Sequence, residues 1–217
     1  MSDALVIDAA LVGRLVAAQL PHLAHLPVRP VPQQGHDNRT FRLGDELVVR
    51  LPSAAGYVGA VAVEDRWLPA LAPRLPVPVP VPVAIGEPGE GYPFPWAVRR
   101  WVPGVSLDPL ALGSDALAAD VGGFLRALHR IPAVDGPPAG ERTHHRGAHP
   151  SVYGADVRSA LASIGRAIDV RAAEAIWADA VATAWDAEPV WVHGDVAAGN
   201  LLVDDVGRLV GVIDFGQ

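Results

Sequence analysis

The sequence predicts an α+β fold in which most strands come first and most helices follow. Short β-type segments bounded by glycine and proline gather between residues 28 and 102. Helix-period patterns dominate residues 114–185, and compact apolar runs return after residue 190. Such separate blocks of strands and helices are typical of an α+β domain.

The first half is expected to combine helices with several short strands. Apolar residues at helical spacing predict helices over 8–20, which Pro21 ends, and over 58–71. From Pro76 to Pro82 every second residue is proline, which excludes helix and central strand and favours an extended segment over 73–82. Short β-type runs predict strands at 28–31, 40–43, 47–51, 83–86 and 96–102.

The second half is expected to begin as a helix. Ser114 is a suitable N-cap for a helix that runs to His129, and a loop rich in Pro, Gly and His follows over 132–150. Pro103-Gly104 breaks the chain where its charge balance shifts, so we expect an N-terminal lobe of residues 1–102 and a second lobe of residues 103–217. Further patterns predict helices at 152–168 and 170–185, and strands at 190–193, 201–203 and 209–213.

Composition excludes several classes of protein. The 217 residues are 50% hydrophobic and 19% charged, which is incompatible with a disordered chain. No run approaches about 18 apolar residues, so no membrane span is expected. Without cysteine the chain has no disulfide scaffold or thiol nucleophile, which is compatible with a cytoplasmic location. All 17 basic residues are arginine, so lysine Schiff-base chemistry is unavailable.

Charge is distributed unevenly along the chain. Residues 1–103 hold nine acids and nine arginines, whereas residues 104–217 hold fifteen acids and eight arginines. A net charge of −7 with no basic run argues against nucleic acid as a partner. The acidic second half would suit a cationic substrate, although an acidic surface kept for solubility explains the same imbalance.

Residues 191–217 carry the most informative motif. It contains His193-x-Asp195, then Asn200 five residues later, and a DFG tripeptide that begins at Asp214. Asn200 and Asp214 offer the oxygen ligands that Mg²⁺ takes when it bridges phosphates. Asp195 can then orient a substrate hydroxyl and accept its proton during attack on a γ-phosphoryl group, while His193 is expected to orient the loop.

Other interpretations of these residues remain open. Asp195 and Asp214 could be an ordinary turn residue and a strand cap. Together with His193 they could instead hold a hydrolytic metal, but no further histidine lies near these strands and Asn200 stands at the kinase spacing. The histidines of the 132–150 loop fit no standard metal-site spacing and are expected on a polar surface: His144, His145 and His149.

The segments HGDVAAGN and VIDFG resemble the catalytic loop and metal motif of the aminoglycoside phosphotransferase family, small-molecule kinases related to eukaryotic protein kinases. HGD in place of the protein kinases' HRD favours the small-molecule group. The resemblance runs from about residue 20 to the end. It also includes GHDNRTFRL (35–43), LVVRLP (47–52), VEDRWLPALAPRLPVPVPVPV (63–83), GYPFPWAVRRWVPG (91–104) and RGAHPSVYGADVRSAL (146–161).

The resemblance implies a protein-kinase-like fold with a small N-terminal antiparallel β lobe and a helical C-lobe, which bind ATP or GTP between them. It makes residues 35–40, including Asn38, the loop over the nucleotide, and it places the backbone at Trp101 against the adenine. The implied acceptor is a small hydroxyl-bearing molecule, with an aminoglycoside as the default and antibiotic resistance as the associated role. The catalytic aspartate and the two Mg²⁺ ligands of the family correspond to Asp195, Asn200 and Asp214.

Two departures from the family pattern stand out. The lysine that grips the phosphates corresponds to Arg50, and its helix partner to Glu64. Arginine keeps the charge and can bind phosphate bidentately, but its fork geometry differs. Because the chain contains no lysine, a compositional drift towards arginine explains Arg50 equally well. Arg50 could also be an ordinary exposed residue of a strand, and Glu64 an exposed residue of a helix.

The second departure is at the end of the sequence, which stops one residue after the DFG tripeptide. In the family several helices follow and supply much of the acceptor pocket. We therefore expect an incomplete helical lobe with exposed apolar surface. The leading hypothesis is a small-molecule kinase, and the alternative is a catalytically weak or inactive nucleotide-binding remnant of that family.

Overall fold

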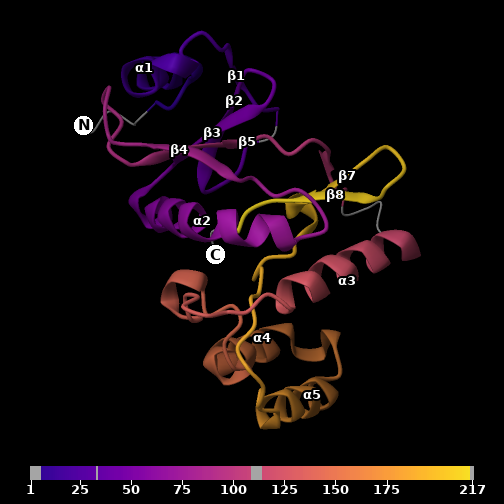
Figure 1. Ribbon diagram of the computed structural model, residues 1–217. Coiled ribbons are helices and arrows are strands. Elements are labelled where there is room, and N and C mark those ends of the chain that lie inside the picture. Colours follow the sequence, from indigo (N-terminus) through magenta and orange to yellow (C-terminus); the bar gives the residue numbers. More distant parts are fainter. Residues whose placement is uncertain (1–5, 33, 109–113, 216–217) are drawn as a thin grey trace, which may run out of the picture.

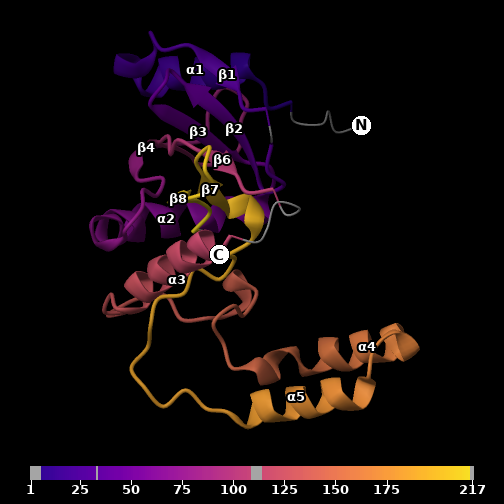
Figure 2. The ribbon, with the colours of Figure 1, turned by 90° about the vertical axis from the view of Figure 1, so that its right-hand side faces the viewer.

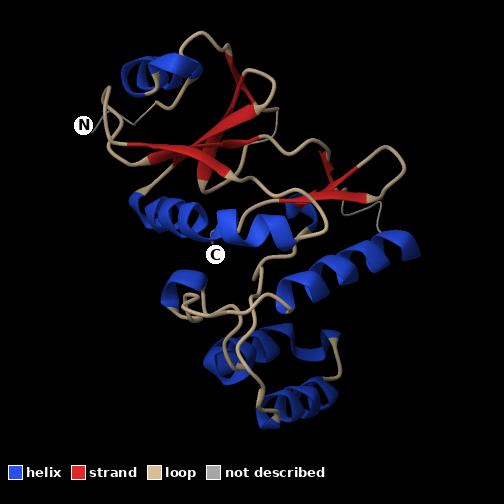
Figure 3. Ribbon diagram, viewed as in Figure 1, coloured by secondary structure: helices blue, strands red, loops and turns tan. Residues whose placement is uncertain are grey.

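The computed structural model describes residues 6–32, 34–108 and 114–215, which form two antiparallel sheets and five α-helices. Figure 1 shows the larger sheet between helices α1 and α2, with the smaller sheet beside α2. The strands lie in the upper part of the molecule, and helices and loops make up the rest (Figure 3). The predicted α+β class is confirmed.

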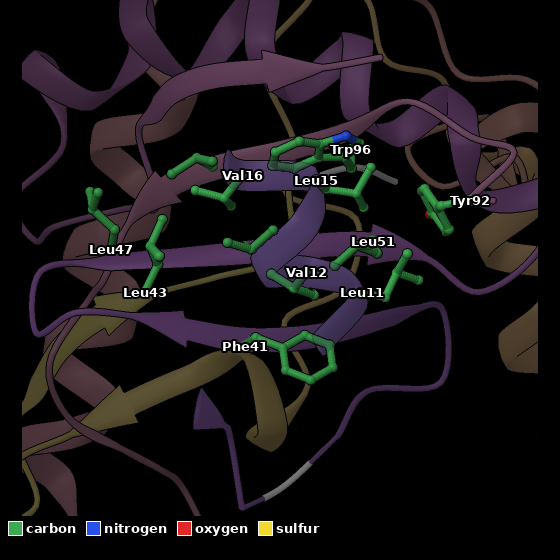
Figure 4. Close-up of a cluster of buried hydrophobic side chains, with 12 residues drawn as sticks. Leu11, Val12, Leu15, Val16, Phe41, Leu43, Leu47, Leu51, Tyr92 and Trp96 are labelled. Atoms are coloured by element: carbon green, nitrogen blue, oxygen red, sulfur yellow. The ribbon is translucent and has the colours of Figure 1, made fainter. Parts of the chain in front are cut away.

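The larger sheet has the strand order β1-β2-β3-β5-β4 and is antiparallel throughout. Helix α1 (Ala9–Gln19) begins after Asp8, whose carboxylate accepts the Leu11 N–H at 2.8 Å. The apolar side of α1 covers one face of this sheet, where Leu15 packs near Trp96 (Figure 4). The strands are β1 (Val28–Pro30), β2 (Asn38–Leu43), β3 (Leu47–Pro52), β4 (Pro82–Gly86) and β5 (Trp96–Arg100).

Helix α2 (Val58–Leu71) covers the opposite face of the same sheet (Figure 1). Leu47, Val49 and Leu51 of β3 belong to the core under α1, so strand alternation turns Arg50 towards α2. Arg99 of β5 faces α2 for the same reason, because its neighbour Val98 lies in the core under α1. The buried face of α2 consists of Val61, Glu64, Leu68 and Leu71.

The smaller sheet has the order β6-β7-β8 and rests on helix α3 (Asp115–His129). Ser114 caps α3 as predicted and accepts the Leu117 N–H at 3.3 Å. Leu71 at the end of α2 joins the same apolar cluster, which ties the two sheets together. The strands are β6 (Val105–Ser106), β7 (Leu201–Val203) and β8 (Leu209–Val212).

Helices α4 (Gly154–Ile164) and α5 (Val170–Ala182) lie side by side, apart from both sheets (Figure 2). Neither helix contains a buried residue, and Ile176 is 71% exposed. This agrees with the expectation of exposed apolar surface in the second half. None of the helices in the described ranges is long and apolar enough to cross a membrane.

Several predicted boundaries need correction. Residues 190–193 do not form a strand and make only an isolated bridge between Val190 and Pro132. Pro132 has no N–H to extend a ladder, and the neighbouring His193 is used elsewhere. The strand expected to reach residue 102 ends at Arg100, and α4 stops at Ile164 because Gly165 is left-handed (φ +55°). Strand β6 was not expected at all.

Candidate active site

His193 holds the loop that leads into β7. It is 2% exposed; its Nε2–H donates to the Ile213 carbonyl at 3.0 Å, and its Nδ1 accepts the Asp195 N–H at 3.2 Å. Because a carbonyl only accepts and an amide N–H only donates, these bonds require the neutral ring with its proton on Nε2. Burial lowers the pKa of His193, which favours that neutral form. His193 therefore orients the loop, as the sequence predicted.

Asn200 fixes the side chain of Asp195. Its Nδ2 donates to the Asp195 backbone carbonyl at 3.0 Å and to Asp195 Oδ2 at 3.3 Å. Since both amide hydrogen bonds come from Nδ2, the Oδ1 atom of Asn200 is left for another partner. The loop thus presents a restrained carboxylate and an amide oxygen five residues apart.

Asp214 lies at the same end of the small sheet as Asn200. The Ile213 N–H donates to the Asn200 carbonyl at 3.0 Å, which continues the pairing of β7 with β8. Asp214 itself is left-handed, with φ +69°, a conformation that aspartate tolerates better than most residues. Backbone strain of this kind clusters at functional sites. Gly216 of the DFG tripeptide lies outside the described residues.

A buried group of charges joins Asp214 to the larger sheet. Arg50 Nη2 contacts Asp214 Oδ1 at 2.9 Å, and Arg50 Nη1 is 3.3 Å from both oxygens of Glu64. Arg99 Nη2 contacts Glu64 Oε2 at 2.9 Å. Glu64 Oε1 also accepts the Phe215 N–H at 3.0 Å, so this carboxylate anchors the DFG backbone as well.

Burial separates these side chains from ordinary surface ion pairs. The side chains of Glu64 and Arg50 are 3% and 17% exposed, which excludes the exposed positions considered for them above. Burial alone would lower the pKa of Arg50, but Glu64 and Asp214 outweigh it and the pKa is raised. At Arg99 burial dominates over the attraction of Glu64, and the pKa is lowered.

The residues present fit a magnesium ion. Mg²⁺ is bound by one or two carboxylates, other oxygen ligands and the substrate's phosphates rather than by a cage of protein ligands. Asp214 supplies a carboxylate and Asn200 an uncommitted amide oxygen at one end of the β7–β8 pair. Both ring nitrogens of His193 are engaged, by the Ile213 carbonyl and the Asp195 N–H, and the described ranges hold no cluster of three or more His, Cys, Asp or Glu side chains that could bind a metal ion.

Two predicted site residues lie outside this charged group. Asn38 opens β2 opposite Pro52, and the next residue of the strand, Arg39, donates from Nη1 to the carbonyl of Gly35 in the preceding loop at 2.9 Å. Trp101 follows β5, and its N–H donates to the Glu46 carbonyl at 2.8 Å. The guanidinium of Arg42 lies 4.1 Å from the centroid of the Trp101 ring. The structure therefore places Asn38 at the start of β2 and Trp101 just after β5, and among the described residues it gives neither of them a contact with the charged group.

Two arginines at the site were not identified from the sequence. Arg99 follows the apolar strand residues Trp96, Ala97 and Val98, and a charge that continues such a run is the signal that could have revealed it. Arg146 Nη1 lies 3.8 Å from Asp195 Oδ2, and its stem packs on Gly194, where an added Cβ would be 3.3 Å from Arg146 Cβ. The two residues before Arg146 are both left-handed, which no sequence pattern reveals: His144 (φ +50°) and His145 (φ +59°).

Comparisons with solved structures agree with this architecture. The GDP and kanamycin complex of APH(2")-IIIa is 22% identical and matches 94% of this chain and 71% of its own, with a TM-score of 0.69. The GDP complex of wild-type aminoglycoside 2'-phosphotransferase-IIIa is 20% identical; the match covers 97% of this chain and 73% of that one, with a TM-score of 0.70. The apoenzyme of macrolide 2'-phosphotransferase MphH from Brachybacterium faecium is 21% identical; the match covers 96% of this chain and 72% of that one, with a TM-score of 0.63. At these identities the likeness shows the fold, which is that of kinase-like phosphotransferases.

The family is shown by a separate comparison. No curated protein matches the chain significantly. Residues 28–217, however, match the model of the phosphotransferase enzyme family (APH), which spans both sheets and the whole of the site described above. The chain therefore belongs to the phosphotransferase enzyme family.

Proposed function

We propose that this enzyme transfers the γ-phosphoryl group of a nucleoside triphosphate, ATP or GTP, to a hydroxyl group of a small molecule. Residues 1–102 form the nucleotide-binding lobe in this proposal, and residues 103–217 form part of the catalytic lobe. The phosphotransferase family supports the type of reaction, and the geometry of the site supports the assignment of roles.

One observation carries the proposal: Arg50 Nη2 of β3 and Asp214 Oδ1, which follows β8 of the other sheet, are 2.9 Å apart. A cation that can bind phosphate and a carboxylate that can bind Mg²⁺ therefore meet beside the Asp195–Asn200 loop. A triphosphate with its metal needs both kinds of partner at one place.

Each side chain has a defined task. Asp195, held through Oδ2 by Asn200, accepts the proton of the attacking hydroxyl. Asn200 and Asp214 would hold Mg²⁺, which supplies charge neutralisation to the phosphates when bound. Arg50 binds the phosphates, with Glu64 behind it. Asn38 and Trp101 are proposed as nucleotide contacts, from the start of β2 and from the segment after β5.

The acceptor is proposed to be an aminoglycoside-type or related small molecule. Solved structures with a similar fold include aminoglycoside and macrolide phosphotransferases, one of them in complex with kanamycin. A cationic acceptor suits the second half of the chain, which carries fifteen acids and eight arginines. We also propose a cytoplasmic location, with which the absence of cysteine is compatible.

Product formation tests this function. The protein is incubated with Mg²⁺, with ATP or GTP, and with a panel of aminoglycosides and macrolides, and the acceptor is analysed by mass spectrometry. A gain of one phosphate that needs the nucleotide supports the proposal. Nucleotide binding without any phosphorylated acceptor would instead support the alternative of an inactive nucleotide-binding remnant, and the absence of both would contradict the proposal.

A further inference from the structure

Glu64 is shared by two arginines from neighbouring strands. Arg99 Nη2 lies 2.9 Å from Glu64 Oε2, and Arg50 Nη1 lies 3.3 Å from each Glu64 oxygen. One carboxylate can neutralise only one of two guanidinium groups. The pair of arginines therefore carries one surplus positive charge, and Asp214 takes it up through Arg50 Nη2.

Arg99 is an unusual side chain for this position. It is 1% exposed, and its Nε and Nη1 atoms have no hydrogen-bond partner in the described part of the chain. Unsatisfied buried donors destabilise a fold, and an apolar side chain of similar size would pack there without that cost. Packing does not explain an arginine here, whereas its charge does.

We propose that Arg99 is a positioning residue that neutralises Glu64 and thereby leaves the charge of Arg50 available to the phosphates of the nucleotide. This inference rests on the proposed phosphotransferase function. With Arg99 present, Arg50 can exchange Asp214 for a phosphate oxygen while Glu64 stays paired. Without Arg99, Glu64 and Arg50 neutralise each other, and Arg50 has no surplus positive charge left to bind a phosphate oxygen.

The test compares nucleotide with nucleoside. Dissociation constants are measured by calorimetry for ATP or GTP with Mg²⁺, whichever the wild type binds more tightly, and for the matching nucleoside. Arg99→Met is expected to weaken nucleotide binding at least tenfold, about 1.4 kcal/mol, and to leave nucleoside binding within threefold. Arg100→Met is the matched control, since Arg100 is the exposed neighbour that pairs with Glu46, and it is expected to bind like the wild type.

A second variant separates charge from packing. Arg99→Met combined with Glu64→Gln removes both buried charges, so Arg50 regains its surplus charge, and nucleotide affinity is expected to return to within threefold of the wild type. If Arg99 served only packing, Glu64→Gln would add to the damage instead of reversing it. The double variant also keeps the test decisive if Arg99→Met does not fold, because no buried charge is left unpaired in it.

The outcomes separate the inference from the function on which it rests. A wild type that binds neither ATP nor GTP overturns the proposed function. A wild type that binds nucleotide, with Arg99→Met equally tight or with a double variant still tenfold weaker, overturns the role of Arg99 alone. Arg99→Lys keeps the charge and is expected to retain nucleotide affinity within threefold. If the shape of the arginine mattered and its charge did not, this variant would lose affinity as Arg99→Met does.

Discussion

Arg50 and Asp214 are 164 positions apart in the sequence and are joined by an ion pair of 2.9 Å. Arg50 stands on β3 of the larger sheet, and Asp214 follows β8 of the smaller one. The contact joins the cation that we propose for phosphate binding to the carboxylate that we propose for metal binding. If these roles hold, nucleotide and metal replace the ion pair when they bind, because each partner then has another ligand.

Substitution of Arg50 tests the phosphate role. Arg50→Met is expected to weaken nucleotide binding about 10- to 100-fold, the usual effect of losing hydrogen bonds to a charged group. Arg50→Lys keeps the charge but loses the forked guanidinium, so its nucleotide affinity should lie between those of the wild type and Arg50→Met. Calorimetric titration with nucleotide measures the effect, and exposed Arg74→Met serves as the control. Unchanged affinity in Arg50→Met would remove Arg50 from the site.

Substitution of Asp195 tests the catalytic base. Asp195→Asn keeps the shape of the side chain but cannot accept the proton of the acceptor, so kcat should fall about 10²- to 10⁴-fold. Nucleotide affinity should change little, because the phosphates contact other residues. Steady-state kinetics measures both quantities. Asp205→Asn, in the exposed turn between β7 and β8, is the matched control. An Asp195→Asn variant as active as that control would show that Asp195 is not the catalytic base.

Much of this site could be predicted from the sequence because its determinants are local. His193, Asp195 and Asn200 belong to one short stretch, and the apolar runs after them predict the strand pair β7 and β8 that follows the loop. The buried face of α2 could also be predicted from the sequence, because Val61, Leu68 and Leu71 repeat at helical spacing.

What could not be predicted depends on contacts between distant segments. Arg99 meets Glu64 only because the pairing of β5 with β3 places Arg99 on the sheet face that α2 covers, and strand register cannot be read from a single sequence. Residues 190–193 have the composition of a strand, yet only Pro132 lies opposite. Arg146 reaches Asp195 through two left-handed histidines, a conformation that residue type does not indicate.

The buried His193 predicts a pH dependence of stability. Burial lowers its pKa in the folded state below the ordinary value of 6.5, so in mildly acidic solution the unfolded chain binds a proton that the folded chain does not. The free energy of unfolding should be fully retained above pH 6.5 and should fall as the pH drops below it, by at most about 1.4 kcal/mol per pH unit.

Denaturant titrations between pH 4.5 and 8 measure that slope. His193→Gln can still donate to the Ile213 carbonyl and accept the Asp195 N–H but cannot titrate, so its stability should depend less on pH in this range. Equal slopes for the wild type and His193→Gln would show that His193 does not contribute.

A glycine in β8 tests the close approach of the small sheet to the segment after β5. A Cβ at Gly211 would overlap Val102 Cγ1, so Gly211→Ala should destabilise the protein by about 1–3 kcal/mol and lower nucleotide affinity. Gly122→Ala on α3 meets nothing within 4 Å and should be stabilising by about 0.5–1 kcal/mol. Chemical denaturation measures the free energy of unfolding of both variants. Equal stability of Gly211→Ala and Gly122→Ala would contradict the close packing of Gly211 against Val102.

The dependence of nucleotide binding on Mg²⁺ tests the central claim, that Asp214 and Asn200 form a metal site against the phosphates held by Arg50. Dissociation constants for ATP or GTP are measured with and without Mg²⁺ in the wild type, in Asp214→Asn and in the control Asp205→Asn. We expect Mg²⁺ to tighten binding at least tenfold in the wild type and the control. In Asp214→Asn this gain should disappear, while metal-free affinity is retained or improved because Arg50 has lost its competing carboxylate. An Asp214→Asn variant with the full Mg²⁺ effect would contradict the account.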